Sequence, residues 1–406
     1  MMIPYGYKQT EVGVIPEDWS VSALEKLYNI TSSKRVFQSQ WRKSGVPFYR
    51  AREIAVMSEG KIAPEDLYID ESLYNQYIHQ YGSINKNDIL ITGVGTLGKV
   101  YVVKENDRFY FKDGNIIWLQ AKHDFSSIYL KYQYDMPALI NQVFGNAGGS
   151  TVATYTITNA KTTKVPVPPL PEQQRIAEAL SDVDGMISSL EKLVAKYKSI
   201  KTACLQQMFP QNGETVPRMR LPGFTGAWEQ RKVSELFRVT RGYVLAATQT
   251  ETTKTDEKPH PVYSSQTKDK GLMGYYKDYL YEDAITWTTD GANAGTVNYR
   301  AGKFYCTNVC GVLLSNEVKA NQMIAEALNS VAKGYVSYVG NPKLMNNVMA
   351  DIVIQIPTQA EEREQLSSFF AKLDNLITLH QRKLEKIQKI KQGMMQQLLT
   401  GKIRLK

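Results

Sequence analysis

One glycine-rich stretch of this 406-residue chain has a spacing that could bind a nucleotide, Gly93-Val-Gly-Thr-Leu-Gly-Lys-Val. It fits both GxGxxG and G-x4-GK, patterns in which a glycine turn opens a helix whose first N–H groups hold phosphates. Here the turn leads into Val100-Tyr-Val-Val, a strand pattern, and Val100 stands where a P-loop needs Ser or Thr for magnesium. We therefore interpret the stretch as a tight β-turn, matched later by Asp290-Gly-Ala-Asn-Ala-Gly-Thr, and expect no nucleotide there.

Signatures of catalysis and metal binding do not stand out in the sequence. The chain has no N-P-P-[FY] or D-P-P-Y tetrapeptide of the kind that clamps a target base for methylation, and no carboxylate-and-lysine cluster typical of a nuclease. The histidines are scattered and the cysteines lack CxxC spacing, which predicts neither a metal site nor a disulfide framework. These residues are His79, His123, His260, His380, Cys204, Cys306 and Cys310. We expect no catalytic residue and no metal or cofactor bound by this chain.

The formal net charge of +9 permits a polyanionic partner, and nucleic acid is the usual one. Direct readout of DNA favours Arg or Lys on guanine and Asn or Gln on adenine, while Lys, Ser, Thr and backbone N–H groups hold phosphates. Loop residues of these types are the candidates for DNA contact, with ordinary solvated surface as the alternative for each. In the first half of the chain they are Lys34, Arg35, Arg42, Lys43, Arg50, Arg52, Lys99, Ser150 and Thr151. In the second half they are Arg241, Tyr243, Gln266, Lys268, Lys270, Thr289, Asn293 and Lys343.

A long stretch that occurs twice must position these loops. Its first copy occupies residues 168–209 and begins PPLPEQQRIAEAL, and its second copy begins EREQLSSFFAKL at an offset of 190 residues. Under that offset Asp184 matches Asp374, and Lys201 matches Lys391. An internal repeat indicates the architecture of a chain more strongly than any local motif does.

Apolar residues in both copies recur at alternating spacings of four and three, which predicts a coiled-coil seam. A helix of about 37 residues would be about 55 Å long. Because both copies belong to one chain and a globular segment returns the chain between them, we expect the two helices to pack on each other antiparallel. The seam residues are Ile176, Leu180, Val183, Ile187, Leu190, Val194 and Tyr197 in the first copy, and Phe370, Leu373, Ile377, Leu384 and Ile387 in the second.

Each helix follows a globular segment that contains runs of β-branched and aromatic residues between Gly, Asn and Asp, a pattern typical of short strands and tight turns. Trp19 in the first segment and Trp228 in the second hold the same relative position. Strands are predicted to begin at Asp88, Val100, Phe109, Asn115 and Lys164, and at Ala284, Val297, Phe304, Val309 and Asp351; helices are predicted over 128–144 and 321–331. The sequence thus predicts an α+β fold, with two β-rich globular domains separated by two long antiparallel coiled-coil helices in a pseudo-twofold internal repeat.

This plan resembles the DNA-specificity subunit of type I restriction–modification enzymes. The resemblance rests on the PPL-x-EQ-x-x-I-A helix start, on the openings IPEDW and LPGFTGAWEQRKVSEL, and on QQLLTGKIRL after the second helix. It covers essentially the whole chain, although the second helix start, PTQAEEREQLSSF, departs from the pattern. The resemblance implies target-recognition domains at residues 1–167 and 211–358, and conserved spacer helices at residues 168–210 and 359–406.

The resemblance further implies a subunit without chemistry of its own, whose two target-recognition domains read the halves of a bipartite, asymmetric site in double-stranded DNA. The helices would fix the gap between the halves and dock two methyltransferase subunits that bind S-adenosylmethionine. Restriction subunits, which use ATP and magnesium, would join that core. The basic residues of the second helix would contact either the DNA backbone in the gap or the methyltransferase, if they are not simply solvated. These residues are Arg382, Lys383, Lys386, Lys389 and Lys391.

Two other functions stay open. One is a helical scaffold whose globular domains bind protein, and the other is a stand-alone nuclease or methyltransferase, which the missing signatures disfavour. No apolar run approaches the roughly 20 residues that span a bilayer, and the first residues lack the basic-then-apolar pattern of a signal peptide. We therefore expect a cytoplasmic chain without membrane contact.

Overall fold

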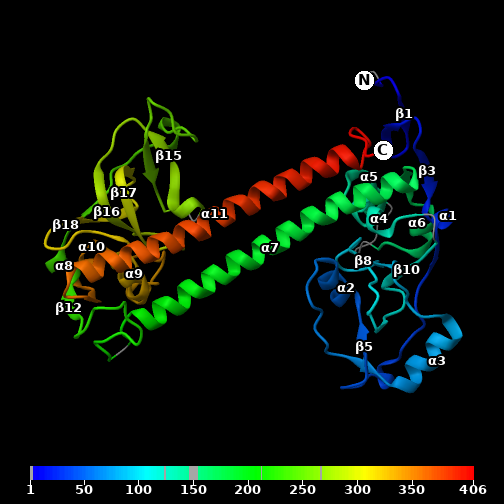
Figure 1. The fold of residues 1–406 in the computed structure, drawn as a ribbon, viewed down its shortest axis with the longest axis horizontal. Coiled ribbons are helices and arrows are strands. Elements are labelled where there is room, and N and C mark those ends of the chain that lie inside the picture. The colour runs from blue at the N-terminus through cyan, green and yellow to red at the C-terminus, as the bar shows by residue number, and fades with distance from the viewer. Residues whose placement is uncertain (1–2, 123–124, 146–153, 212, 266–267) are drawn as a thin grey trace. The chain divides into compact units, whose positions relative to one another are not determined.

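The computed structural model describes residues 3–122, 125–145, 154–211, 213–265 and 268–406. The chain forms two compact units, unit 1 (Met1–Ser189 with Leu384–Lys406) and unit 2 (Leu190–Lys383). Each unit contains one globular domain and parts of both long helices, labelled α7 and α11 in Figure 1. The boundaries between the two units therefore lie within the long helices and not at the helix ends.

A four-stranded antiparallel sheet lies at the centre of the first globular domain, in the order β4-β10-β7-β8. Its strands are β4 (Tyr28–Thr31), β10 (Ile116–Ala121), β7 (Ile89–Thr92) and β8 (Val100–Val102). Beside it, β5 (Val46–Tyr49) pairs in parallel with β9 (Tyr110–Phe111) and antiparallel with β6 (Tyr68–Ile69). Two further pairs are formed by β1 (Tyr7–Thr10) with β2 (Gly13–Pro16), and by β3 (Ser20–Ala23) with β11 (Lys164–Val167).

The helices of this domain are short. They are α1 (Leu24–Leu27), α2 (Ala51–Ser58), α3 (Glu71–Tyr81), α4 (Ser127–Gln133), α5 (Pro137–Gly145) and α6 (Ile157–Thr162). The single helix predicted over 128–144 is wrong, because the chain forms α4 and α5 with a break before Pro137. Proline has no N–H to donate and is tolerated only in the first turn of a helix, the position it takes in α5.

The second globular domain is built around a six-stranded sheet in the order β13-β18-β16-β17-β14-β15. Its strands are β13 (Phe237–Arg241), β18 (Cys310–Ser315), β16 (Tyr281–Thr288), β17 (Val297–Cys306), β14 (His260–Tyr263) and β15 (Leu272–Tyr276). A separate pair joins β12 (Glu229–Lys232) to β19 (Val353–Ile356). The helices are α8 (Val233–Leu236), α9 (Gln322–Val331) and α10 (Asn346–Asp351).

The two domains share one sheet plan, and the α+β prediction is confirmed. The order β4-β10-β7-β8 corresponds to β13-β18-β16-β17, and in both domains a parallel neighbour follows, β5 beside β9 and β14 beside the end of β17. The hairpin registers also correspond, with Ile91 opposite Val100 and Trp287 opposite Val297. The strands predicted separately at Val297 and Phe304 are one strand, β17, where the first domain has β8 and β9.

The tryptophan near the start of each domain is buried against a long helix of its own unit. Trp19 is 0% exposed, and its Nε1 donates a hydrogen bond to Glu172 Oε2 at 3.1 Å. Trp228 is 3% exposed and packs edge-on against Phe209, with ring centroids 5.5 Å apart. Buried aromatic rings contribute much of the apolar area of a core. The sequence repeat is thus also a repeat of packing.

The two long helices are α7 (Leu170–Met208) and α11 (Ala360–Leu398), each of 39 residues. In unit 1 they run antiparallel, since Arg175 contacts Leu405 while Asp184 pairs with Lys391. In unit 2 they also run antiparallel, since Lys201 pairs with Asp374 while the chain end of α7, at Phe209, meets Phe370. The prediction of antiparallel packing is confirmed within each unit, where the green and orange-to-red helices of Figure 1 lie side by side.

Burial along both helices follows the spacing of four and three. The buried members of the seam are Ile176, Leu180, Val183, Leu190, Val194, Phe370, Leu373 and Ile377, and the partly buried members are Ile187, Tyr197, Leu384 and Ile387. None of the helices in the described part of the chain is both long and apolar enough to cross a membrane.

Candidate nucleic-acid interface

The glycine-rich stretch at Gly93 forms the turn of a β-hairpin, as predicted. It joins β7 to β8, and the Gly98 N–H donates to the Thr92 carbonyl at 2.9 Å. The second turn joins β16 to β17 in the same way, with the Gly295 N–H donating to the Thr288 carbonyl at 2.9 Å. Gly98 and Gly295 have φ of +70° and +80°, a conformation that favours glycine. No helix begins at either turn, so neither offers the N-terminal amides that a P-loop uses.

Several loops meet where these hairpin turns lie, and we call this edge of each central sheet the turn end. In the first domain β4 and β7 stop there and β10 starts, which gathers residues 32–35, 93–99 and 113–115. In the second domain β13 and β16 stop there and β18 starts, which gathers residues 242–244, 289–296 and 307–309. Strand ends carry loops whose side chains are free to vary, which makes each turn end a natural recognition surface.

Lys34 and Arg35 lie at the turn end of the first domain. The Lys34 ammonium stands 4.8 Å from the centre of the Tyr81 ring, and the Lys34 N–H donates to the Tyr110 hydroxyl at 2.9 Å. Arg35 is exposed, and its Nε pairs with Asp113 Oδ2 at 3.1 Å. An exposed ion pair of this kind is weak and can be exchanged for a phosphate at little cost.

The other basic candidates of this domain are more closely tied to the protein. Arg42 pairs with Asp70 at 2.7 Å, and both Arg50 and Arg52 bind the carboxylate of Glu53, which is 1% exposed. Burial alone would raise the pKa of Glu53, but the hydrogen bonds from the two arginines hold it below its ordinary value. Arg50 and Arg52 therefore neutralise a buried carboxylate. Lys43 is exposed, and Lys99 lines an open cavity of about 780 Å³ together with Asp135.

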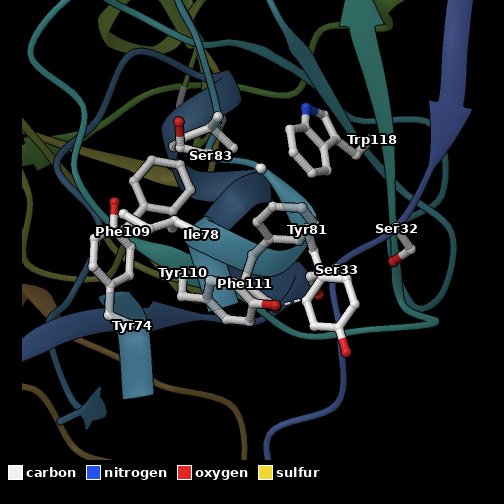
Figure 2. A pocket seen from close by; sticks show the side chains of 12 residues that line it. Ser32, Ser33, Tyr74, Ile78, Tyr81, Ser83, Phe109, Tyr110, Phe111 and Trp118 are labelled. Atoms are coloured by element: carbon white, nitrogen blue, oxygen red, sulfur yellow. Dashed lines mark hydrogen bonds between the residues drawn. The ribbon is translucent and has the colours of Figure 1, made fainter. Parts of the chain in front are cut away.

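An aromatic pocket of about 330 Å³ lies directly beside Lys34. Figure 2 shows the rings of Tyr81, Phe109 and Trp118 around it, with the Ser33 hydroxyl donating to the Phe111 carbonyl at 2.6 Å. Burial raises the pKa of Tyr110 to about 12, so this phenol stays protonated at neutral pH. The pocket offers ring faces and neutral hydrogen-bonding groups. It is lined by Ser32, Ser33, Tyr74, Ile78, Tyr81, Gly82, Ser83, Ile84, Phe109, Tyr110, Phe111 and Trp118.

At the turn end of the second domain Arg241 and Tyr243 are exposed. Thr289 is buried, and its hydroxyl donates to Asp290 at 2.7 Å, so this side chain is used inside the turn. Lys343 pairs with the same Asp290 at 3.7 Å. Ser150, Thr151 and Gln266 lie outside the described residues, and Lys268 begins the short 3-10 turn Lys268–Gly271.

Lys270 and Asn293 line one polar cavity together with Arg300, which sequence reasoning missed. The Asn293 amide donates to the Ser265 carbonyl at 3.1 Å, and the Lys270 ammonium lies 3.5 Å from Asp374. Arg300 is buried in β17, among residues that read as an ordinary strand. Only the internal repeat could have drawn attention to Arg300, because it aligns this arginine with the apolar residue Val103.

The two seam lysines connect the long helices to the globular domains. Lys201 pairs with Asp374 of α11 at 2.7 Å and with Glu326 of α9 at 2.6 Å. Lys391 pairs with Asp184 of α7 at 2.6 Å. The other basic residues of α11 considered above, Arg382, Lys383, Lys386 and Lys389, are exposed.

An arginine beyond the end of each helix holds a buried glutamate at the start of the other. Arg404 binds Glu172 with Nε at 2.7 Å and also binds Asp18 at 2.7 Å. Arg220 binds Glu362 with Nε and Nη2, both at 2.7 Å. The hydrogen bond from Arg404 lowers the pKa of Asp18 from 3.8 to about 2. Sequence reasoning missed these pairs, although Glu172 and Glu362 occupy matching positions under the offset of 190 residues.

No group of three or more His, Cys, Asp or Glu side chains within the described ranges is arranged to hold a metal ion. His380 stacks on Tyr197 with ring centroids 5.5 Å apart and planes 5° apart, as a packed seam residue. Cys306 and Cys310 are buried, and burial raises the pKa of Cys310 to about 11, which keeps this thiol protonated.

Known proteins similar to this chain agree with its repeated plan. The family described as "Type I restriction modification DNA specificity domain" matches residues 16–201 and again residues 226–389. A putative type I restriction enzyme specificity subunit of Methanocaldococcus jannaschii is 24% identical over 98% of this chain and 97% of its own length. A putative specificity subunit of Haemophilus influenzae is 30% identical over 46% of each chain. The crystal structure of the type I restriction–modification S subunit from M. genitalium has the same fold, with a TM-score of 0.68 over 94% of this chain and 96% of its own, at 14% identity.

The two family matches fall on the two halves of the repeat, and each combines a globular domain with most of the long helix that follows it. The M. jannaschii relative aligns across both halves. The resemblance noted in the sequence is therefore confirmed. The chain belongs to the DNA-specificity family of type I restriction–modification systems and is a DNA-recognition subunit.

Proposed function

We propose that the two target-recognition domains read the two halves of a bipartite, asymmetric site in double-stranded DNA through their turn ends. The observation that carries this proposal is a common sheet plan that presents different side chains. The strand registers align Ser32 with Arg241 and Lys34 with Tyr243, where β4 and β13 end. One scaffold with unlike recognition residues suits two unlike half-sites.

We further propose that the long helices dock two methyltransferase subunits. Leu376 and Leu379 of α11 are 39% and 62% exposed, and with the exposed Lys383 they follow the i, i+3, i+7 spacing of one helix face. Exposed leucines beside cations are typical of a protein-binding surface rather than a DNA-binding one. This spacing supports a methyltransferase contact on that face. The exposed Arg382, Lys386 and Lys389 remain available for either partner.

In this proposal the chain itself carries no chemistry. S-adenosylmethionine would be bound by the methyltransferase subunits, and ATP and magnesium by restriction subunits that join the same cytoplasmic assembly. The support is the family description, which assigns DNA specificity to this kind of domain.

The decisive experiment combines this chain with its copurified methyltransferase and maps methylated positions across a genome, with and without the chain. We expect methylation at one bipartite motif only when the chain is present. We also expect binding to a duplex with that motif to weaken steeply as salt rises, through counterion release. If the chain changed neither the DNA affinity nor the choice of site, the DNA-reading proposal would be wrong. Turnover by the purified chain alone, with S-adenosylmethionine and magnesium, would contradict the absence of chemistry.

A further inference from the structure

The second target-recognition domain contains an open cavity of about 650 Å³ beside its turn end. Polar and basic side chains line it together with Trp287 and Cys310, and none of the described residues that line it is acidic. Threonine and asparagine side chains provide hydrogen-bond donors, and Arg300 provides positive charge, while the ammonium of Lys270 lies 3.5 Å from Asp374. The lining residues are Ser264, Lys270, Gly271, Thr286, Trp287, Thr288, Asn293, Thr296, Asn298, Arg300 and Cys310.

Arg300 is 6% exposed, and no carboxylate among the described residues pairs with it. Its Nε donates to the Thr286 hydroxyl at 3.0 Å, its Nη2 donates to the Lys270 carbonyl at 2.7 Å, and its guanidinium lies 3.6 Å from the centre of the Tyr263 ring. Burial lowers the pKa of this guanidinium, yet arginine stays charged in proteins. A guanidinium has five N–H donors, so these two hydrogen bonds leave donors without a partner in the described part of the chain. A buried cation without a counter-ion is costly, and an anion at this point would offset that cost.

The fold does not require an arginine at this position. By strand register, Val103 of the first domain corresponds to Arg300, and Tyr49 corresponds to Tyr263. In the first domain Val103 and Tyr49 belong to an apolar cluster with Ile54, a residue of α2 that is 0% exposed. Between β14 and β15 the described residues of the second domain form the 3-10 turn Lys268–Gly271 and no α-helix, and the cavity lies there instead. The buried arginine beside this cavity is therefore particular to the second domain.

We propose that this cavity is a phosphate-binding site, with Arg300 as its central donor. The fork of a guanidinium matches two oxygens of a phosphate group, and Thr and Asn side chains complete such sites. In the assembled enzyme the phosphate belongs to the DNA backbone, a statement that rests on the proposed function above. The site holds the second domain on its half-site without reading a base.

The test uses the full chain assembled with its methyltransferase subunits. The affinity of this assembly for a duplex that contains the recognised site is measured at several salt concentrations. Arg300→Met should reduce the slope of log affinity against log salt by about 0.9, the value for one phosphate contact. Asn298→Tyr should have the same effect, because it fills the cavity with the residue that stands at the corresponding position in the first domain, Tyr101, and leaves the Arg300 contacts in place. Arg238→Met, in the exposed part of β13, is the matched control and should leave the slope unchanged.

A second arm separates a DNA phosphate from a small anion. The Tm of the chain is measured in inorganic phosphate and in chloride at equal ionic strength. The difference between these two Tm values is then compared among the wild type, Arg300→Met and Asn298→Tyr. Stabilisation by phosphate that both variants lose, with an unchanged DNA slope, supports the site but assigns it to a free anion. If Asn298→Tyr folds and alters neither the slope nor the phosphate effect, the proposal is overturned. If the wild-type assembly bound no specific duplex, the proposed function would fail, and the phosphate arm would still decide the cavity.

Discussion

Glu172 and Glu362 stand at equivalent positions in the two long helices and are 2% and 0% exposed. A buried carboxylate is tolerated only when its charge and lone pairs are satisfied. Arg404 and Arg220 provide this with two hydrogen bonds each. Such pairs contribute little net stability over an apolar replacement, but removing one partner leaves an uncompensated buried charge. At the residue scale, the two arginines are therefore critical for the stability of their units.

Replacing Arg220 by methionine should destabilise unit 2 by about 3–5 kcal/mol, because Glu362 would stay buried without its partner. The matched control is Arg218→Met, since Arg218 pairs with Glu214 at 3.1 Å in solvent, with side chains 58% and 38% exposed. The loss there should be under about 1 kcal/mol. Hydrogen exchange under increasing urea, with unit 1 as an internal reference, measures the loss of stability that each substitution causes. Equal effects of the two substitutions would contradict the structural role of the Arg220 pair.

Asp18 should make the stability of unit 1 depend on pH in acid. Its pKa is lowered from 3.8 to about 2, chiefly by the hydrogen bond from Arg404. A lowered pKa in the folded state gives stability above the ordinary pKa that is lost as pH falls through the folded one. The difference in Tm between the wild type and Asp18→Asn should thus be constant near neutral pH and shrink from about pH 4 to about pH 2. In an Arg404→Met background the difference should be small at every pH; a difference that persists would assign the effect to another partner.

At the scale of elements, the long helices and the globular domains are joined by the seam lysines. Lys201 bridges α11 and α9, and Lys391 pairs with α7 while its ammonium lies 5.4 Å from the centre of the Tyr132 ring of α4. The spacing of four and three predicts the seam, because that spacing is local in sequence. It does not predict Glu326 or Tyr132 as neighbours of the lysines. Those contacts depend on how each globular domain packs on its helices, which is a long-range property.

The exposed face of α11 gives a prediction at the same scale. Leu379→Glu should weaken association with the methyltransferase at least about tenfold, since burying a carboxylate in an apolar contact is costly. Sedimentation velocity of mixtures measures the association, and circular dichroism checks that the helix is intact. Ile62→Glu is the control, because Ile62 is 96% exposed and lies in a loop outside both helices. Unchanged association for Leu379→Glu would place the methyltransferase on a different surface.

At the scale of the whole molecule, the sequence predicted the repeat, most of the strands and the two seams, because each depends on local period or self-similarity. It did not predict which candidates share a surface. Lys270, Asn293 and Arg300 meet only because β14, β16 and β17 pair across distant parts of the chain. Arg50 and Arg52 looked like DNA contacts, since nothing in their neighbourhood shows that Glu53 is buried beneath them. In the sequence, a charged residue that has a partner inside the protein cannot be distinguished from one that is available to DNA. Only the fold shows which residue is the partner.

The chain passes from unit 1 to unit 2 at Ser189 and returns at Lys383, which allows the spacer role to be tested. One heptad inserted in α7 after Ser189 and one in α11 after Lys383 would keep the contacts within each unit. Seven helical residues add about 10 Å. We expect a longer tolerated gap between half-sites, by about 3 base pairs, with the half-sites themselves unchanged, when methylated positions are mapped. Changed half-sites would contradict the spacer role, and a heptad in α7 alone serves as the out-of-register control.

The interrupted course of unit 1 has a consequence for biosynthesis. Residues 384–406, which supply Arg404 to Glu172 and Leu398 and Leu399 to the core around Trp19, are translated after the whole of unit 2. At about 5–20 residues per second, the nascent unit 1 waits roughly 10–40 s with this apolar surface uncovered. Unit 2, a continuous segment, is complete before unit 1. The first globular domain is thus the first to leave the ribosome and the last to close, and its uncovered apolar surface is prone to aggregation during that interval.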